Sequence, residues 1–252
     1  MKESNVKFYT SSTPSGVKVS IALEELGIPH KLEHLDISTS RQEEPWFLEI
    51  NLDGRIPAIT DTLADGIFES GSILIYLAEQ YEKIPQDQLP SRMLVLDPCK
   101  AKSTTLSAFR LAPQKIQYAI DRYVTEVRRL YSVIEKRLQQ SKSGFLVGDH
   151  ISLADITTVG WVIWSGFAGV DMTEFPAIVR WERMLNARHA VAKGLDVPKP
   201  LKIRAATAGN SVKRVGNVGS KMATQTKTRS SLSRFLFNHP PCHQNAPNPL
   251  NI

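Results

Sequence analysis

The chain has 252 residues, of which 42% are hydrophobic and 22% are charged. This composition is normal for a soluble globular protein, and the length suits one large domain or two ordinary ones. The formal net charge is +6, but residues 201–252 contain eight lysines and arginines and no acidic residue, so residues 1–200 carry a charge of −2. Because the positive charge is concentrated in the last part of the chain, the body of the protein is not expected to bind nucleic acid.

The two cysteines, Cys99 and Cys242, form neither a disulfide framework nor a metal-binding pattern, so we expect no metal cofactor. Residues 1–7 lack the apolar core of a signal peptide. The most apolar run, at 157–170, is interrupted by glycine and is too short to span a membrane. We therefore expect a cytoplasmic protein with no membrane span.

Residues 6–84 alternate between short strand-like and helix-like segments. In the first helical segment apolar residues repeat at helical spacing, at Val19, Ala22, Leu23 and Leu26, before a stop at Gly27. The expected order is a strand at 6–11, this helix, a strand at 30–37, a short helix at 44–51, strands at 56–61 and 66–69 with a turn at 64–66, and a helix at 70–81. A βαβ unit followed by a hairpin and a helix predicts a small mixed sheet, in a domain at 1–84.

From residue 112 to residue 200 the pattern is helical. Pro113 suits a first helical position, and an apolar stripe then runs from Ile116 to Leu138. The sequence "SLAD" resembles a capping box, in which Ser152 and Asp155 satisfy each other's backbone amides. The helix that follows is apolar on nearly all sides and should be buried. We therefore predict an all-helical domain at 112–200.

Two segments lie outside these domains. Residues 85–111 begin as a linker and continue with a stretch that contains Pro98 and has no clean period, so we predict at most a poor or truncated helix there. Residues 201–252 are rich in Ser, Thr, Asn and Pro. Such a segment cannot bury enough apolar surface to offset its ordering entropy. We predict a disordered basic tail.

Three motifs could carry chemistry, and each has a purely structural alternative. Ser15 opens a helix, where it could cap the first turn or offer its hydroxyl to a sulfur anion. Glu69 and Ser70 could likewise cap a helix, or bind the ammonium and carboxylate groups of an amino-acid-like ligand. Pro57 precedes a strand, and base rates favour a trans bond there. A cis bond would instead turn the Ile56 backbone outward as a docking edge.

Taken together, these segments resemble the glutathione S-transferase family. The resemblance covers roughly residues 6–90 and 112–200. It is carried by the segments "TPSGVKVSIALEELGIPH", "FLEINLDGRIPAI", "FESGSILIYLAE" and "FLVGDHISLADI". Within the family, the sequence is most similar to the nu-type and fungal nitrogen-regulator-like branch. It implies an α/β thioredoxin-like N-terminal domain followed by an all-α glutathione-transferase C-terminal domain.

The resemblance also implies roles for individual residues. Pro57 would be a cis-proline, and Ile56 would offer its backbone to the cysteinyl part of glutathione. Glu69 and Ser70 match the pair that binds the γ-glutamyl end. The other matched positions are Gln42 and Asn51, which would approach glutathione, Arg110, a possible contact to a glutathione carboxylate, and Ser152 and Asp155, which would be structural.

The resemblance implies that residues at the start of the first helix activate the glutathione thiol. This chain reads "TPSG" where the branch usually reads "TPNG", so Ser15 replaces an Asn thought to engage the thiol. A serine hydroxyl can donate the same hydrogen bond, which favours the thiolate. Thr13 or Ser12 could share this task. Tyr9 is a rival, although its spacing to Gly16 is too long for a good match.

The implied function is an enzyme that uses glutathione as co-substrate and activates its thiol. It would transfer glutathione to electrophiles in detoxification, or reduce disulfides or peroxides, and it could form a homodimer. Residues 91–111 depart from the family, which has a long helix there, so the alternative is a non-catalytic regulatory or scaffold module. A third reading, a binder of nucleic acid or membrane surfaces through the basic tail, has the least support.

Overall fold

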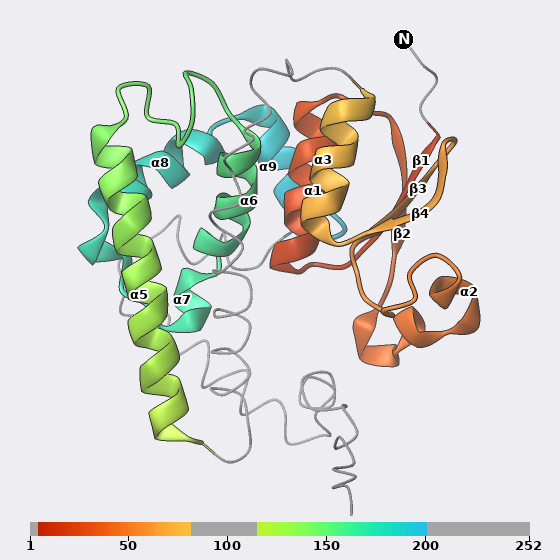
Figure 1. Cartoon of the computed structure of the whole chain (residues 1–252), viewed down its shortest axis with the longest axis horizontal. Coiled ribbons are helices and arrows are strands. Elements are labelled where there is room, and N and C mark those ends of the chain that lie inside the picture. The colour runs from red at the N-terminus through yellow and green to blue at the C-terminus, as the bar shows by residue number, and fades with distance from the viewer. Residues whose placement is uncertain (1–4, 82–114, 201–252) are drawn as a thin grey trace, which may run out of the picture.

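The computed structural model describes residues 5–81 and 115–200. In the N-terminal domain, four strands form one sheet in the order β2-β1-β3-β4 (Figure 1). The strands are β1 (Val6–Thr10), β2 (His30–His34), β3 (Ala58–Asp61) and β4 (Ala64–Phe68). β1 is parallel to β2, and β3 is antiparallel to both β1 and β4. The predicted mixed sheet is confirmed.

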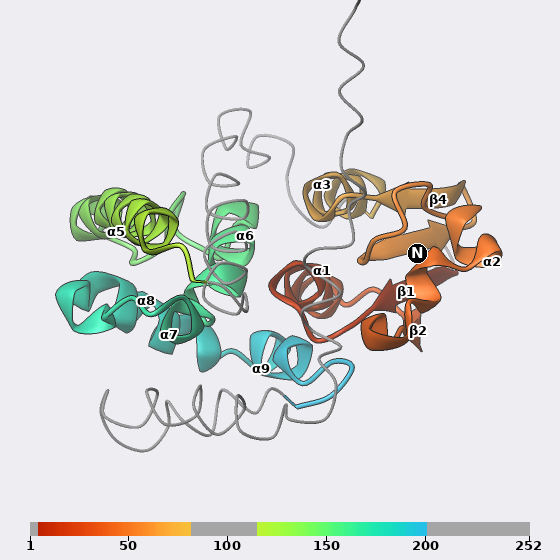
Figure 2. The ribbon, with the colours of Figure 1, turned by 90° about the horizontal axis from the view of Figure 1, so that it is seen from below.

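Helices cover both faces of this sheet (Figure 2). They are α1 (Pro14–Glu25) and α3 (Ser70–Gln80) on one face, and α2 (Pro45–Leu48) with 3-10 turns at Ile37–Thr39 and Arg41–Glu43 on the other. Successive side chains of a strand point to opposite faces. Accordingly, Phe8 of β1 lies in the main core with α1 and α3, whereas Tyr9 lies in a smaller core with Phe47 of α2.

The hairpin between β3 and β4 turns earlier than the sequence suggested. We predicted a turn at 64–66, but the turn lies at residues 62–63, and Gly66 is inside β4. Glycine is needed at this position for a different reason. A Cβ on Gly66 would lie 2.2 Å from the carbonyl oxygen of Ile50. The glycine therefore permits a close approach of two backbones and does not mark the turn.

Asp61, at the end of β3, ties the hairpin to α3. Its Oδ2 accepts hydrogen bonds from the hydroxyls of Tyr76 at 2.9 Å and Tyr81 at 2.8 Å. Its Oδ1 accepts the backbone N–H of Thr62 at 2.7 Å. Partial burial alone would raise the pKa of the Asp61 carboxyl, but the hydrogen bonds outweigh burial and leave the pKa below its usual value.

The C-terminal domain is all-helical in the described residues. Its elements are α5 (Gln117–Gln140), α6 (Leu153–Val162), α7 (Ser165–Ala168), a 3-10 turn at Met172–Glu174, α8 (Pro176–Asn186) and α9 (His189–Leu195). No helix in the described part of the chain is long and apolar enough to cross a membrane. The long helix begins at Gln117, after an extended Ile116, so the prediction that it starts at Pro113 is wrong. Pro113 itself, the irregular segment at 85–111 and the tail at 201–252 lie outside the described residues.

Two buried carboxylates fix the ends of helices in this domain. At the start of α6, Asp155 Oδ2 accepts the Ser152 N–H at 2.9 Å, and Ser152 Oγ accepts the Asp155 N–H at 3.4 Å, so the predicted capping box is present. Glu135 of α5 accepts the N–H groups of Ala177 and Ile178 at 2.9 Å each. These two amides are among the four that an α-helix leaves unpaired at its start. Glu135 thus caps α8 from another helix.

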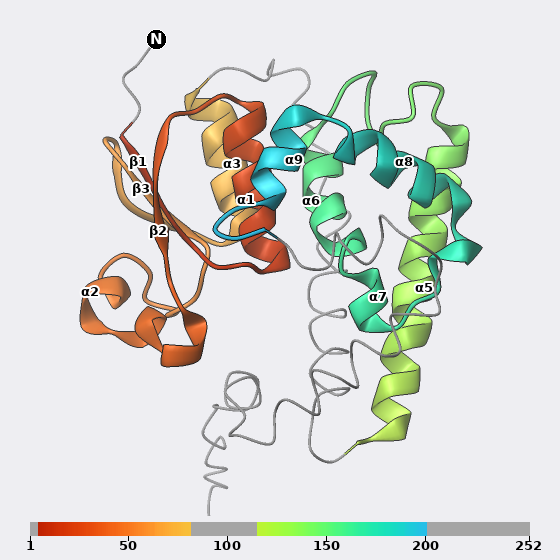
Figure 3. The same ribbon diagram turned by 180° about the vertical axis from the view of Figure 1, so that it is seen from behind.

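Helix α1 is shared between the two domains, because α6 and α9 pack on the side that faces away from the sheet (Figure 3). Gly194 of α9 allows this close packing, since a Cβ there would lie 2.7 Å from the Cα of Ile21. Arg188 adds a bidentate ion pair, with its Nε and Nη2 donating to the two carboxylate oxygens of Glu25 at 2.7 Å and 2.8 Å.

Candidate functional site

The sheet register brings three segments to one end of the sheet. Tyr9 of β1 pairs with Ala58 of β3, and Ala58 in turn pairs with Phe68 of β4. Beyond these pairs, β1 leads into the first turn of α1, β3 is preceded by Pro57, and β4 leads into Glu69 at the start of α3. The starts of α1 and α3 and the loop before β3 therefore meet at the same end of the sheet.

The loop before β3 is held by a buried amide side chain. Asn51 is 2% exposed; its Nδ2 donates to the Arg55 carbonyl at 2.6 Å, and its Oδ1 accepts the Asp53 N–H at 3.0 Å. The Ile56–Pro57 bond that follows is cis. The cis bond agrees with the family resemblance, whereas the general preference of X-Pro bonds for the trans form had favoured a trans bond. Asn51 therefore supports the segment that leads to the cis-proline.

Gln42, from the second 3-10 turn, lies against the same loop. Its backbone oxygen would be 3.2 Å from a Cβ on Gly54, which has a φ of +61°. The Gln42 side chain is 2% exposed, and its Nε2 donates to Glu43 Oε1 at 3.4 Å. Its Oε1 has no hydrogen-bond partner among the described residues. Since buried polar atoms are normally paired, this oxygen is a candidate acceptor for a ligand N–H.

The start of α3 is not capped by a side chain. Glu69 precedes the helix with a φ of +65°, a conformation that is rare outside glycine and frequent at functional sites, and its side chain makes no capping hydrogen bond. Ser70 is 1% exposed, and its Oγ has no hydrogen-bond partner among the described residues. A Cβ on Gly71 would meet nothing within 4 Å. The predicted capping by Glu69 or Ser70 is therefore wrong, and this helix end has room for a ligand.

At the start of α1 the cap is Thr13, not Ser15. Thr13 has an extended backbone, and its Oγ1 accepts the Gly16 N–H at 3.1 Å. Pro14 explains the choice, because a proline drives the residue before it into the extended conformation that an N-cap needs. The interpretation of Ser15 as the cap is wrong. Since Pro14 has no N–H, Ser15 is the first helical residue that has both an amide hydrogen and a hydroxyl.

Gly16 is a structural requirement of this site to which the sequence analysis gave no role. A Cβ on Gly16 would lie 2.3 Å from Thr10 Oγ1 and 2.6 Å from the Ser11 carbonyl oxygen. Only glycine therefore lets β1 turn directly into α1. The signal was present in the sequence, as a glycine placed two residues after a proline at a helix start.

The remaining candidates lie elsewhere. Tyr9 is 4% exposed and packs against Trp46 and Phe47, at ring-centroid distances of 6.1 Å and 5.8 Å, on the α2 side of the sheet. It therefore points away from α1. Ser152 and Asp155 serve the capping box of α6. Arg110 lies outside the described residues.

The starts of α1 and α3 offer their unpaired amides at this end of the sheet. The first turns of both helices contain no acidic residue, and the N-cap residue of α3 is Glu69, which places one carboxylate beside that helix end. Helix N-termini offer unpaired N–H groups and a favourable dipole to negative charge. The geometry suits an extended, peptide-like ligand with a carboxylate at α3 and a second anionic group at α1.

The two domains match family models in the same order along the chain. Residues 14–80 match the glutathione S-transferase N-terminal domain, and residues 98–189 match the glutathione S-transferase C-terminal domain. The chain therefore belongs to the glutathione S-transferase family, and the resemblance seen in the sequence is confirmed.

Individual relatives are similar over most of the chain. The disulfide-bond oxidoreductase YfcG of Escherichia coli is 34% identical over 206 residues, which cover 75% of this chain and 94% of YfcG. A glutathione transferase homologue from Lodderomyces elongisporus, solved with two GSH per subunit, is 31% identical with a TM-score of 0.71, covering 77% of this chain and 99% of that one. The nitrogen regulation fragment of the yeast prion protein Ure2p is 30% identical with a TM-score of 0.70, covering 76% and 96%.

Proposed function

We propose that this protein binds glutathione across the starts of α1 and α3 and activates its thiol. The observation that carries the proposal is Ser70, a fully buried hydroxyl without a partner among the described residues, at a helix start that no side chain caps. Family membership supports it, as does the glutathione bound by the Lodderomyces homologue.

In this proposal the γ-glutamyl end of glutathione occupies the start of α3. Its carboxylate accepts hydrogen bonds from the Ser70 hydroxyl and the first-turn amides, and its ammonium pairs with Glu69. The cysteinyl backbone pairs with the Ile56 backbone by main-chain hydrogen bonds, just before β3 begins. Gln42 is buried beside the loop that Asn51 supports, and it adds an acceptor.

The thiol then lies at the first turn of α1. The Ser15 hydroxyl donates to the sulfur, assisted by the Ser15 amide and the Thr13 hydroxyl. The Thr13 oxygen already accepts the Gly16 N–H, and its own O–H can donate to the sulfur. Hydrogen bonds to the charged form, together with a helix N-terminus, lower a thiol pKa from its ordinary value of about 8.5. The thiolate is the reactive nucleophile.

The chemistry that fits the YfcG relative is disulfide reduction with glutathione as reductant. The thiolate attacks one sulfur of a substrate disulfide, an S–S bond forms, and the other sulfur leaves as a thiolate that takes up a proton. A second glutathione then attacks the mixed disulfide, which releases oxidised glutathione and the reduced substrate. Attack of the same thiolate on an electrophilic carbon or a peroxide would give conjugation or peroxide reduction.

A thermal-shift titration with glutathione tests the proposal. We expect wild-type protein to be stabilised by about 2.7 kcal/mol at a glutathione concentration roughly 100 times Kd. Ser70→Ala should lose most of this stabilisation. Ser20→Ala is the matched control, because the Ser20 hydroxyl is also buried without a partner among the described residues but lies within α1. Equal titrations for wild type and Ser70→Ala would contradict the assignment.

A non-catalytic glutathione-binding module is the second candidate, favoured by the similarity to the nitrogen regulation fragment of Ure2p. Turnover separates the two candidates. Glutathione-dependent reduction of a model disulfide, lost in Ser15→Ala while binding persists, would support the enzyme. Saturable binding with no turnover on disulfide, peroxide or electrophile would support the module. The homodimer, the role in detoxification and the cytoplasmic location stay predictions.

A further inference from the structure

A lysine is buried where the helical domain packs on the start of α1. Lys18, in the second turn of α1, is 1% exposed. Lysines are almost never fully buried unless other interactions compensate for the lost hydration. The Lys18 ammonium nitrogen lies 5.1 Å from the centroid of the Trp161 ring in α6. Because Trp161 is itself only 5% exposed, this cation–π contact is shielded from water and is strengthened by that shielding.

The Lys18 side chain runs back along the first turn of α1. A Cβ on Gly160 of α6 would lie 2.9 Å from Lys18 Cγ and 2.9 Å from the carbonyl oxygen of Pro14, the first residue of α1. Side chains of a helix tilt toward its N-terminus, and Ser15 precedes Lys18 by three residues on the same face. The ammonium is therefore placed beside the turn that carries Ser15, and Gly160 leaves the room for it.

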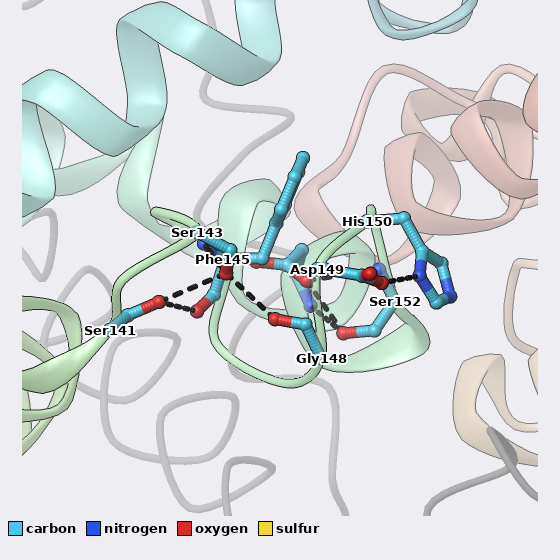
Figure 4. Close-up of polar contacts among 8 residues, drawn as sticks. Ser141, Ser143, Phe145, Gly148, Asp149, His150 and Ser152 are labelled. Atoms are coloured by element: carbon cyan, nitrogen blue, oxygen red, sulfur yellow. Dashed lines mark hydrogen bonds and ion pairs between the residues drawn. The ribbon is translucent and has the colours of Figure 1, made fainter.

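Helix α6, which contacts Lys18, is anchored at both ends. In the loop before it, the hydroxyls of Ser141 and Ser143 donate to backbone carbonyls further along the loop at 2.7 Å each (Figure 4). Near its end, the hydroxyl of Tyr131 in α5 donates to the Trp161 carbonyl at 3.4 Å. The helical domain therefore sets the position of the indole, and with it the position of the ammonium.

The C-terminal end of α6 lies beside the start of α1. α6 ends at Val162, and Gly160, close to that end, approaches Pro14 of α1. Because the C-terminal end of a helix carries partial negative charge, α6 by itself disfavours an anion near the first turn of α1. The Lys18 ammonium offsets this negative charge at the place where the thiol of glutathione is proposed to lie.

The other charged or titratable side chains of α1, α3, α6 and α9 lie away from this turn. They are Glu24 and Glu25 in the last turn of α1, which pair with Lys193 and Arg188, Asp155 in the first turn of α6, Tyr76 and Glu79 in the second half of α3, and His189 at the start of α9. Glu69 precedes α3 at the same end of the sheet, and in the proposed function it pairs with the ammonium of glutathione.

We propose that the buried Lys18 ammonium stabilises the thiolate of glutathione at the start of α1, and that Gly160 and Trp161 hold the ammonium in place. This inference rests on the proposed function and assigns part of the thiol activation to the helical domain. The Ser15 hydroxyl contacts the sulfur, whereas Lys18 acts on it through space. Because a nearby cation favours the charged form, the thiol releases its proton to solvent at a lower pH than it would without Lys18.

Lys18→Met tests the inference, because methionine is also unbranched and fills much of the same space without the charge. Calorimetry on the full chain gives Kd for glutathione over a pH series. Above the pKa of the bound thiol, Lys18→Met should weaken glutathione binding by about tenfold, which corresponds to a rise of about 1 in that pKa. Below it, the thiol is protonated in both proteins and Kd should agree within about twofold. S-methylglutathione has no thiol, so its Kd should agree within about twofold at every pH.

Lys193→Met is the matched control. It removes a cation that pairs with Glu24 at 2.8 Å, at the other end of the same helix. It should leave Kd for glutathione within about twofold of wild type at every pH. Lys18→Gln, a second neutral variant, should behave as Lys18→Met does, and binding of S-methylglutathione shows that each variant is folded.

The outcomes separate this inference from the proposed function. Wild type that binds neither ligand would refute the proposed function, and this inference with it. The role of Lys18 alone is overturned if wild type binds both ligands and the neutral variants at position 18 keep its pH dependence for glutathione. It is also overturned if S-methylglutathione binding weakens as much as glutathione binding, or if Lys193→Met has the same effect.

Discussion

Asp155 offers the sharpest stability prediction, because one buried carboxylate satisfies donors from three parts of the helical domain. It is 0% exposed. Its Oδ1 accepts the Leu146 N–H at 3.0 Å and the Trp181 indole N–H at 2.8 Å, and its Oδ2 accepts the Ser152 N–H at 2.9 Å. Its Oδ2 also accepts the Ser152 hydroxyl at 2.6 Å. Replacing Asp155 by Ala leaves these four donors without their acceptor.

Each buried donor left unpaired costs about 1–3 kcal/mol. Because such losses are not additive, we expect Asp155→Ala to lower the free energy of unfolding by about 3–5 kcal/mol, out of a typical total of about 5–15 kcal/mol. Ser152→Ala removes the hydroxyl that caps α6 and donates to Asp155 Oδ2, leaves the other donors of Asp155 in place, and should cost about 1 kcal/mol. Urea denaturation followed by circular dichroism measures both. A loss below about 1.5 kcal/mol for Asp155→Ala would refute the reasoning that these donors depend on it.

Two further predictions concern the interface between domains and the response to acid. Gly194→Ala places a Cβ 2.7 Å from the Cα of Ile21, so it should destabilise the protein by about 1–3 kcal/mol in urea, although alanine is the better helix former. Gly71→Ala, with open space around it, is the control, and equal stability of both variants would contradict the close packing. The pKa of Asp61 is lowered by its hydrogen bonds, so its contribution is present above its unfolded pKa of about 3.9 and is lost as pH falls through the lower folded value. The free energy of unfolding of Asp61→Asn should therefore fall less than that of wild type between about pH 5 and pH 2, and identical pH profiles would exclude this role.

Local patterns in the sequence predicted much of the fold. The helical spacing around Leu23, the glycine stop at Gly27 and the capping box of Ser152 and Asp155 depend on neighbours within a few residues, and all three are present. The errors arose where several local solutions were equally good. Ser12, Thr13 and Ser15 are all competent caps, and only the backbone restriction before Pro14 selects Thr13.

Long-range contacts account for what the sequence could not reveal. The local sequence predicts Gly66 to be a turn residue, but its close neighbour Ile50 is brought against it only by the tertiary fold. The cap of α8 comes from Glu135, which is more than forty positions away in the chain. Likewise, the burial of the Ser70 hydroxyl could not be read from "FESGS". It is this burial, and not the residue type, that makes Ser70 a candidate ligand contact.

A crystal structure of the protein grown with glutathione tests the central claim most directly. We predict density for glutathione at the end of the sheet where α1 and α3 begin. The γ-glutamyl carboxylate should lie within hydrogen-bond distance of Ser70 Oγ, the cysteinyl backbone beside Ile56, and the sulfur within hydrogen-bond distance of the Ser15 hydroxyl. Glutathione bound elsewhere, or no density at this end of the sheet at a concentration that saturates binding in solution, would contradict the account.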